Sequence, residues 1–256
     1  MLAKSFVALA TLALASAGPV QRRQCSNKPT APTLPVNGNG LELPAPADNL
    51  VLKHIALGHG IQNYTCTSVN GSTSLTANPT GALAALYDAT AFYPSQGAAD
   101  AIPLDAFNGL PTNAVWASKL PLTSDGSTKF GASSSAPFPS PGEDLALPGL
   151  KALPYLGVHF FDAKGTPTFK VGGDGGDIFS GGKLNGTKAP ATADVGPEKT
   201  GAVDWLLLGD KNGASKGVTV IYRVVTAGGV AHQCTTLGAT DSVPYATYYW
   251  MYGPKA

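Results

Sequence analysis

Short runs of alternating apolar and polar residues fill the second half of the chain, and this pattern is typical of β-strands. The segments 155–162 (YLGVHFFD) and 166–171 are separated by three residues, a spacing that predicts a β-hairpin. The segment 217–226 (GVTVIYRVVT) is rich in β-branched residues, which favour strands. The aromatic segment 243–252 (VPYATYYWMY) predicts a further strand near the C-terminus.

The first half of the chain has less regular patterns. Residues 49–66 predict one or two strands that break near residue 59, and the apolar run 81–88 (GALAALYD) fits a strand or a helix. Residues from about 93 to 154 include a stretch rich in Ser and Pro, and we expect a long, partly ordered insertion there. Many short strands joined by turns predict an all-β fold, either an antiparallel β-sandwich or a partly closed barrel with long loops.

The aromatic segment near the C-terminus carries large rings on both sides of its predicted strand. Alternation along a strand places Tyr248 and Trp250 on one face and Tyr245 and Tyr249 on the other. We expect one face to be buried and the tyrosines of the other to lie at an edge of the fold, with their hydroxyl groups in water.

The N-terminus has the composition of an export signal. A basic residue is followed by about ten apolar residues and by a small-x-small sequence ending at Ala17, which predicts a signal peptide over residues 1–17. A dibasic pair ending at Arg23 resembles a fungal secretory processing site and predicts a short propeptide, residues 18–23. No apolar stretch is long enough to cross a bilayer, so the sequence predicts no membrane span. We therefore expect a secreted, extracellular protein.

The processed chain predicts one domain preceded by an arm. Residues 24–48 contain five prolines and are expected to be extended, whereas residues 49–256 are long enough for a single β domain with its own core. Charged residues make up only 13% of the chain and the net charge is +1, without the clustered Lys and Arg that neutralise phosphates. The sequence therefore does not predict a nucleic-acid partner.

Three cysteines follow the predicted cleavage sites, so one of them is left over if two pair in an oxidising compartment. Cys66 and Cys234 lie at or just after strand-like segments, and we predict a disulfide between them. Cys25 lies in the Pro-rich arm and then has no evident partner. A bond between Cys25 and Cys66 stays open as an alternative.

Three Asn-x-Ser/Thr sequences fit the acceptor pattern for N-linked glycosylation. They begin at Asn63, Asn70 and Asn185. Glycosylation at these sites is consistent with the predicted export, although such short patterns also recur by chance. We therefore expect a secreted glycoprotein.

Histidine and carboxylate side chains are the candidates for catalysis or metal binding. His59 is flanked by glycines and His159 lies in an apolar strand, with Asp88 or Asp162 as a further ligand or orienting group. None of the usual closely spaced histidine motifs is present, and structural roles are expected for most of these residues. A Gly-rich segment, residues 172–180, fits one copy of a calcium-binding nonapeptide, but calcium in such proteins is held between stacked copies. We interpret it as a flexible loop and predict no cofactor.

A series of segments resembles the domain of unknown function 3455 family, whose members are exported proteins of fungi and bacteria. The segments are GHGIQNYTC at 58–66, GALAALYD, HFFDAKGTPTF, VDWLLL, YRVVTAGGVAHQC at 222–234 and VPYATYYWMY. The resemblance runs from about residue 50 to residue 252 and covers the expected insertion poorly. Some relatives carry the label malate dehydrogenase. The chain has no G-x-G-x-x-G turn, which a nicotinamide enzyme of that kind needs, so we do not expect NAD-dependent malate dehydrogenase activity.

Two functions remain open. The first is a non-catalytic secreted glycoprotein that binds a cell-wall polysaccharide or an extracellular protein, a role for which exposed aromatic rings and glycans are suited. The alternative is a secreted enzyme, a hydrolase or metal-dependent, that uses a site of His59, His159 and Asp88 or Asp162. No sequence motif selects a substrate for either function.

Overall fold

The computed structural model describes residues 30–255 except positions 70, 118, 131 and 212. The predicted signal peptide and propeptide, with Ala17 and Arg23, lie outside the described residues. So do Cys25 and the sequon residue Asn70. The predictions made for these residues stay predictions.

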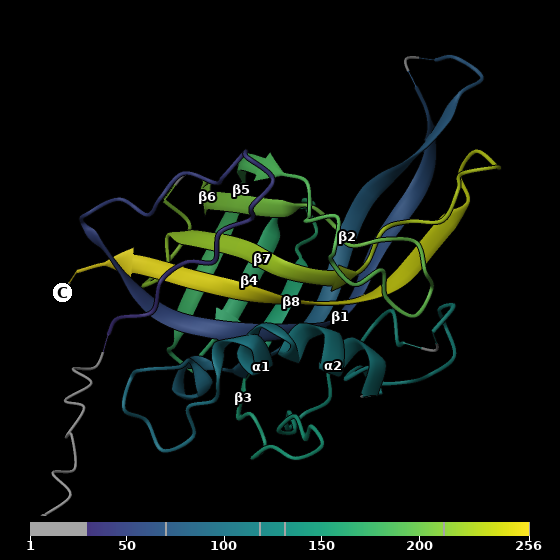
Figure 1. The fold of residues 1–256 in the computed structure, drawn as a ribbon. Coiled ribbons are helices and arrows are strands. Elements are labelled where there is room, and N and C mark those ends of the chain that lie inside the picture. Colours follow the sequence, from purple (N-terminus) through teal and green to yellow (C-terminus); the bar gives the residue numbers. More distant parts are fainter. Residues whose placement is uncertain (1–29, 70, 118, 131, 212, 256) are drawn as a thin grey trace, which may run out of the picture.

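Eight strands form one antiparallel sheet in which each strand pairs with its neighbour in the chain (Figure 1). The last strand pairs with the first, so the sheet closes on itself. This arrangement confirms the expected all-β antiparallel fold. The strands are β1 (Leu50–Ser68), β2 (Leu75–Asp88), β3 (Tyr155–Phe161), β4 (Pro167–Val171), β5 (Asp177–Thr187), β6 (Trp205–Asp210), β7 (Val220–Gly228) and β8 (Thr240–Pro254).

The predicted hairpin is confirmed as β3 and β4, but the predicted break near residue 59 is wrong. The strand β1 runs through both glycines of the Gly-His-Gly sequence, and its register against β2 shifts only between Asn63 and Tyr64. Gly60 is required by close packing of the strands, because a Cβ atom there would overlap the Leu83 carbonyl and the Ala84 backbone. The glycine therefore permits close approach of β2 and does not interrupt the strand.

The expected insertion contains helices that pack on the outside of the sheet. A 3₁₀ turn (η1, Thr90–Phe92) and the helices α1 (Leu104–Asn108) and α2 (Leu110–Ala117) lie beside β1 and β8 (Figure 1). The buried residues Phe107, Leu110, Pro111, Ala114 and Val115 follow the three- and four-residue spacings of a helix face. This part of the insertion is therefore ordered, and the apolar spacing that signals it was overlooked in the sequence.

The sheet separates two buried clusters, because alternate residues of each strand face opposite sides. The inner cluster fills the closed sheet with residues such as Phe169, Phe179 and Tyr249. The outer cluster lies between the sheet and the helices and includes Tyr248 and Trp250. Both faces of β8 are thus buried.

The prediction that the tyrosine hydroxyl groups on one face of β8 lie in water is wrong for Tyr245, Tyr248 and Tyr249. Tyr248 donates a hydrogen bond of 2.6 Å to the backbone oxygen of Phe107 in α1, and the hydroxyl groups of Tyr245 and Tyr249 are 2.9 Å apart inside the sheet. Burial raises the pKa of all three phenols. These tyrosines are held by internal partners and do not form an exposed aromatic surface.

The predicted disulfide between Cys66 and Cys234 is present, with the two Cα atoms 5.6 Å apart. It ties the end of β1 to the connection between β7 and β8. Cys66 also pairs through its backbone, donating to Ala239 O and accepting from Gly238 N. The bond and the backbone pairing together hold this long end of the sheet.

The Pro-rich arm folds back over the sheet from residue 30 onward. Its side chains Leu34 and Leu43 pack against the outer cluster. Tyr222 donates a 2.8 Å hydrogen bond to Pro44 O, and Asn37 Nδ2 donates to Lys188 O at 2.9 Å. The described part of the arm is therefore docked on the β domain.

Candidate functional site

The two histidines of the candidate metal or catalytic site lie on opposite faces of the sheet. His59 on β1 pairs with Ala85 on β2, and Ala85 pairs with Val158 on β3. Paired residues share a face of the sheet, so His59 lies on the same face as Val158. The next residue, His159, therefore lies on the other face. Ala85 belongs to the outer cluster, whereas the residue paired with His159, Ala84, belongs to the inner one. A single metal ion cannot contact two side chains that the sheet separates in this way.

Both rings are buried, with exposed fractions of 1% for His59 and 4% for His159. Burial lowers the pKa of His59 to about 4 and that of His159 to about 3. His159 Nδ1 donates to Thr168 O at 2.9 Å, and its ring stacks on Phe169 with centroids 3.9 Å apart. His159 is thus a neutral core residue. The Nδ1 atom of His59 is also buried, but it has no hydrogen-bond partner among the described residues.

The two candidate carboxylates have local structural contacts. Asp88 accepts a 2.8 Å hydrogen bond from the Thr90 backbone at the end of β2. Asp162 accepts hydrogen bonds from the backbone N–H groups of Lys164 and Thr166 in the β3–β4 turn. These bonds lower the pKa of Asp162, and the bond from Thr166 has the largest effect. Across the described parts of the chain, no group of three His, Cys, Asp or Glu side chains could hold a metal ion.

An ion-pair cluster that the sequence analysis missed lies beside the disulfide. His232 Nδ1 is 3.1 Å from Asp241 Oδ2, and His232 Nε2 is 3.2 Å from Glu198 Oε2. Lys129 approaches the same two carboxylates, at 3.0 Å from Glu198 and 3.7 Å from Asp241. The two ring nitrogens of His232 thus face two different carboxylates. The cluster joins the insertion, the β5–β6 connection, the β7–β8 connection and the start of β8.

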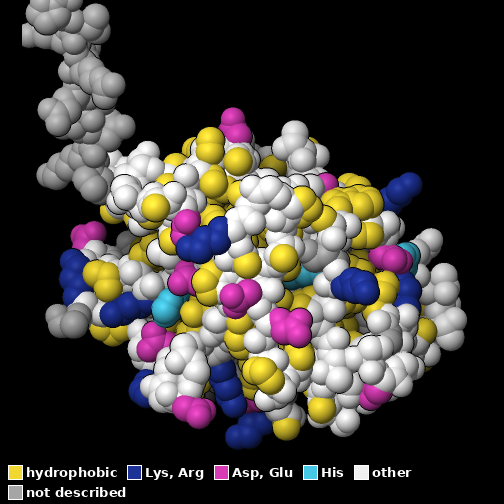
Figure 2. All heavy atoms as spheres, turned by 90° about the horizontal axis from the view of Figure 1, so that it is seen from below, with side chains coloured by type: hydrophobic (Ala, Val, Ile, Leu, Met, Phe, Trp, Pro, Cys, Tyr) yellow, Lys and Arg dark blue, Asp and Glu magenta, His cyan; other side chains and the backbone are white. Residues whose placement is uncertain are grey.

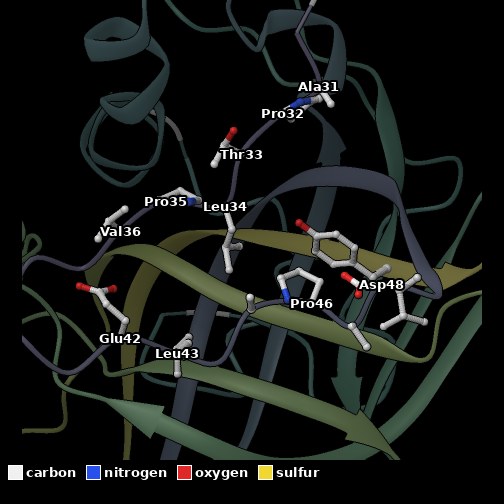
Figure 3. Close-up of a pocket in the computed structure, with 14 residues that line it drawn as sticks. Ala31, Pro32, Thr33, Leu34, Pro35, Val36, Glu42, Leu43, Pro46 and Asp48 are labelled. Atoms are coloured by element: carbon white, nitrogen blue, oxygen red, sulfur yellow. The ribbon is translucent and has the colours of Figure 1, made fainter.

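The arm encloses a groove of 590 Å³ against the ends of β1 and β8 (Figure 3). Its walls are mainly apolar, with Leu34, Pro46 and Leu43 from the two limbs of the arm. The Glu42 carboxylate at this groove accepts two 2.7 Å hydrogen bonds from the backbone of Asn37 and Gly38. That carboxylate therefore stabilises the turn of the arm.

A second groove, of 520 Å³, lies between the insertion and the outer face of β2 and β3, and we call it the insertion groove. The half-buried Tyr155 ring meets the buried Tyr87 ring edge to face, with centroids 6.3 Å apart. Gly142 packs against the Tyr155 ring, and a methyl group there would overlap it. The other residues that line the insertion groove are mostly apolar, but Lys119, Glu143 and Asp144 are charged. The full set of these residues is Ala85, Ala117, Lys119, Leu120, Pro121, Leu122, Pro139, Glu143, Asp144, Leu145 and Ala146.

The charges of the insertion groove are well placed to meet a ligand. Lys119, Glu143 and Asp144 are all exposed. Asp144 Oδ1 accepts a 2.8 Å hydrogen bond from the Tyr155 backbone, which fixes the carboxylate beside the ring. An apolar floor with an aromatic ring and a polar rim binds ligands that have both apolar faces and hydroxyl groups. No short motif in the sequence reveals this site, because its parts come from segments about 70 residues apart.

The predicted glycosylation sites differ in accessibility. Asn185 is exposed on β5. Asn63 is half-buried on β1, and its Oδ1 accepts a 2.8 Å hydrogen bond from Ser242 on the neighbouring strand. Asn185 is thus the more accessible acceptor of the two.

Charged side chains are scattered on the face that carries the insertion. Figure 2 shows Lys and Arg side chains interspersed with Asp and Glu among apolar side chains on this face. None of the helices in the described ranges is long and apolar enough to cross a membrane.

Comparison with known proteins identifies the family. A family model described as "Protein of unknown function (DUF3455)" matches residues 46–253, from the end of the arm to the end of β8. No curated protein and no solved structure matches the chain. The match confirms the resemblance found in the sequence and spans all eight strands of the sheet. The chain therefore belongs to the DUF3455 family of proteins of unknown function.

Proposed function

We propose that this chain is a secreted glycoprotein that binds a cell-wall polysaccharide in the insertion groove without catalysing a reaction on it. The observation that carries the proposal is the half-buried Tyr155 ring in a groove of 520 Å³ rimmed by exposed charges. A sugar ring offers an apolar face to an aromatic ring and hydroxyl groups to carboxylates. The insertion groove supplies both kinds of contact in one place.

The arm groove and the predicted histidine site are less suited to a sugar chain. The arm groove is apolar, and its Glu42 carboxylate is already bonded to the backbone of the arm. The candidate site of His59 and His159 has its members on opposite faces of the sheet. The insertion groove has the exposed carboxylates of Glu143 and Asp144 on its rim.

Two further features support a place outside the cell. A disulfide persists in oxidising compartments, and Cys66 and Cys234 form one. Asn185 is an exposed sequon residue, which a glycosylating enzyme can reach. Together with the predicted signal peptide, they favour export through a secretory pathway.

The test is retention on insoluble chitin, β-glucan and cellulose of protein secreted from a eukaryotic host. We expect retention on at least one polymer, and about tenfold weaker binding for Tyr155→Ala, equivalent to about 1.4 kcal/mol. Glu143→Gln removes an exposed charge without disturbing the core and should weaken binding several-fold. Val36→Ser, at an exposed position of the arm groove, is the matched control and should bind as the wild type does.

Two results would overturn the proposal. The first is wild-type protein that none of the three polymers retains. The second is undiminished retention of both Tyr155→Ala and Glu143→Gln. Thermal unfolding of each variant shows whether it is folded, and Glu143→Gln keeps the test valid if Tyr155→Ala is not.

A further inference from the structure

One tryptophan of the chain is exposed, at the end of α2. Trp116 is 52% exposed, whereas the other two tryptophans, Trp205 and Trp250, are 4% and 0% exposed. A single apolar side chain in water is common on protein surfaces, so the surroundings of the ring decide whether it belongs to a site. Those surroundings hold the Trp116 ring in place and connect it to the insertion groove.

A hydrogen bond fixes the orientation of the exposed ring. The indole Nε1 of Trp116 donates to Oδ1 of Asp194, in the β5–β6 connection, at 2.9 Å. Water can satisfy an indole N–H group at an exposed position, so the effect of the bond to Asp194 is to hold the ring. A ring that is already held loses less conformational entropy when a ligand stacks on it.

Asp194 is itself anchored to the sheet. Its Oδ1 also accepts a 2.8 Å hydrogen bond from the Gly196 backbone, and its backbone oxygen accepts a 2.9 Å hydrogen bond from Gly228 of β7. Gly196 packs closely on Gly228, because a Cβ atom at Gly196 would overlap the Cα atom of Gly228. Trp116 is therefore positioned, through Asp194, by a strand of the sheet.

The end of α2 connects the Trp116 ring to the insertion groove. Ala117, the next residue, is exposed and lines that groove. Both α2 and Tyr155 pack against the outer cluster, so the two rings lie on the same side of the sheet. Trp116 reaches the connection bonded to β7, whereas Tyr155 belongs to β3.

The separation of the two rings sets the length of a ligand that contacts both. The strands β3, β2, β1, β8 and β7 are consecutive in the sheet, so β3 and β7 lie about 20 Å apart along it, at about 4.8 Å for each strand. A single sugar unit is too short to contact Tyr155 and Trp116 together. A chain of several units can do so by crossing the end of α2.

The charges near the two rings favour a neutral chain. Glu143 and Asp144 lie on the rim of the insertion groove, and the half-buried Asp194 lies beside Trp116. Lys119 is the basic residue among those that line the groove. Carboxylates accept hydrogen bonds from the hydroxyl groups of a sugar, and they repel the negative charges of an acidic polysaccharide.

We propose that Trp116 is a second sugar-stacking residue, and that a neutral polysaccharide chain binds from the Tyr155 ring across the end of α2 to the Trp116 ring. This inference rests on the proposed binding of a polysaccharide in the insertion groove. It adds that the ligand is uncharged and several sugar units long. Trp116 supplies an apolar face to a sugar ring, as Tyr155 does at the other end of the site.

The fluorescence of Trp116 provides the measurement, because a soluble quencher reaches this ring and not the two buried tryptophans. The probes are the soluble hexamers and dimers of the sugar units of chitin, β-1,3-glucan and cellulose. We expect the hexamer of the polymer that retains the secreted protein to protect Trp116 from quenching by acrylamide. The corresponding dimer should leave the quenching unchanged, because it is too short to reach from Tyr155 to Trp116.

Variants compare the two ends of the site by calorimetric titration. Trp116→Ala should bind the hexamer about tenfold more weakly than the wild type does and should bind the dimer equally well. Tyr155→Ala should weaken the binding of both, as would a merely structural effect of a substitution. Leu237→Ser, at a position 65% exposed in the β7–β8 connection, is the matched control and should bind as the wild type does. Quenching of the wild type keeps the test valid if Trp116→Ala is not folded.

The outcomes separate this inference from the proposed function. A hexamer that binds but leaves the quenching of Trp116 unchanged overturns the inference, as does folded Trp116→Ala that binds the hexamer as the wild type does. Binding in the insertion groove then stands by itself. Protein that binds no polymer and no hexamer overturns both proposals. Quenching that falls with rising protein concentration, and not with the hexamer, shows that a second copy of the chain covers Trp116 and overturns the inference.

Discussion

Acidification should destabilise the fold through its two buried histidines. The pKa of His59 is about 4 and that of His159 about 3 in the folded chain, whereas a histidine in an unfolded chain titrates near about 6.5. Because the folded pKa values are the lower ones, the unfolded state binds the protons more tightly. The stability contribution is complete above about pH 6.5 and is lost as the pH falls toward the folded pKa values.

The magnitude follows from the two pKa values. Lowering the pH from about 7.5 to about 5 should cost about 2 kcal/mol for each ring, or about 4 kcal/mol for His59 and His159 together. Carboxyl groups with a lowered pKa, such as Asp162 and Asp210, add their loss mainly below about pH 4. A loss of about 4 kcal/mol is a large part of the roughly 5–15 kcal/mol that stabilises an ordinary domain.

The assay is urea unfolding at both pH values, followed by tryptophan fluorescence. His159→Phe and His59→Leu should each remove about half of the difference between the two unfolding free energies, even if the variant is less stable at both pH values. His54→Gln, at a half-exposed histidine, serves as the control. An unfolding free energy that changes by less than about 1 kcal/mol between the two pH values contradicts the assignment of both rings as buried and neutral.

Three further predictions concern stability and processing. Replacing Cys66 and Cys234 by Ala should lower the free energy of urea unfolding by about 5 kcal/mol, because their bond closes a loop with a sequence separation of 168 residues; a loss below about 1 kcal/mol contradicts this. Tyr248→Phe should lower the unfolding free energy by about 1–2 kcal/mol, since it removes the buried hydrogen bond to the Phe107 backbone oxygen of α1, and an unchanged urea midpoint refutes that role. Asn185→Gln should remove one glycan from the secreted protein, visible by mass spectrometry as a smaller mass loss on deglycosylation; an unchanged loss shows that this site is unused.

Local patterns in the sequence predict the parts of the fold that depend on neighbouring residues. The β3–β4 hairpin follows from two apolar segments separated by a short turn. The disulfide follows from two cysteines at strand-like segments in a chain expected to be exported. The antiparallel all-β class follows from many short strands with turn signals.

The candidate site depends on the register between strands, which no local pattern reveals. His59 and His159 are separated by the sheet because the strand β2 lies between theirs with a particular pairing, and a shift of one residue would reverse the face of either ring. The helices α1 and α2 are short, and their apolar spacing lies within a segment rich in Gly, Pro and Ser. The insertion groove forms only when that segment folds against β2 and β3, so Tyr155 and Glu143 come together through tertiary packing.

We propose that the insertion groove holds a sugar chain through the Tyr155 ring. The most direct measurement is a depletion isotherm on the retaining polymer for the wild type, Tyr155→Phe and Tyr155→Ala. We predict that Tyr155→Phe, which keeps the ring, binds within about twofold of the wild type, and that Tyr155→Ala binds about tenfold more weakly. Equal binding of folded Tyr155→Ala and the wild type contradicts the claim.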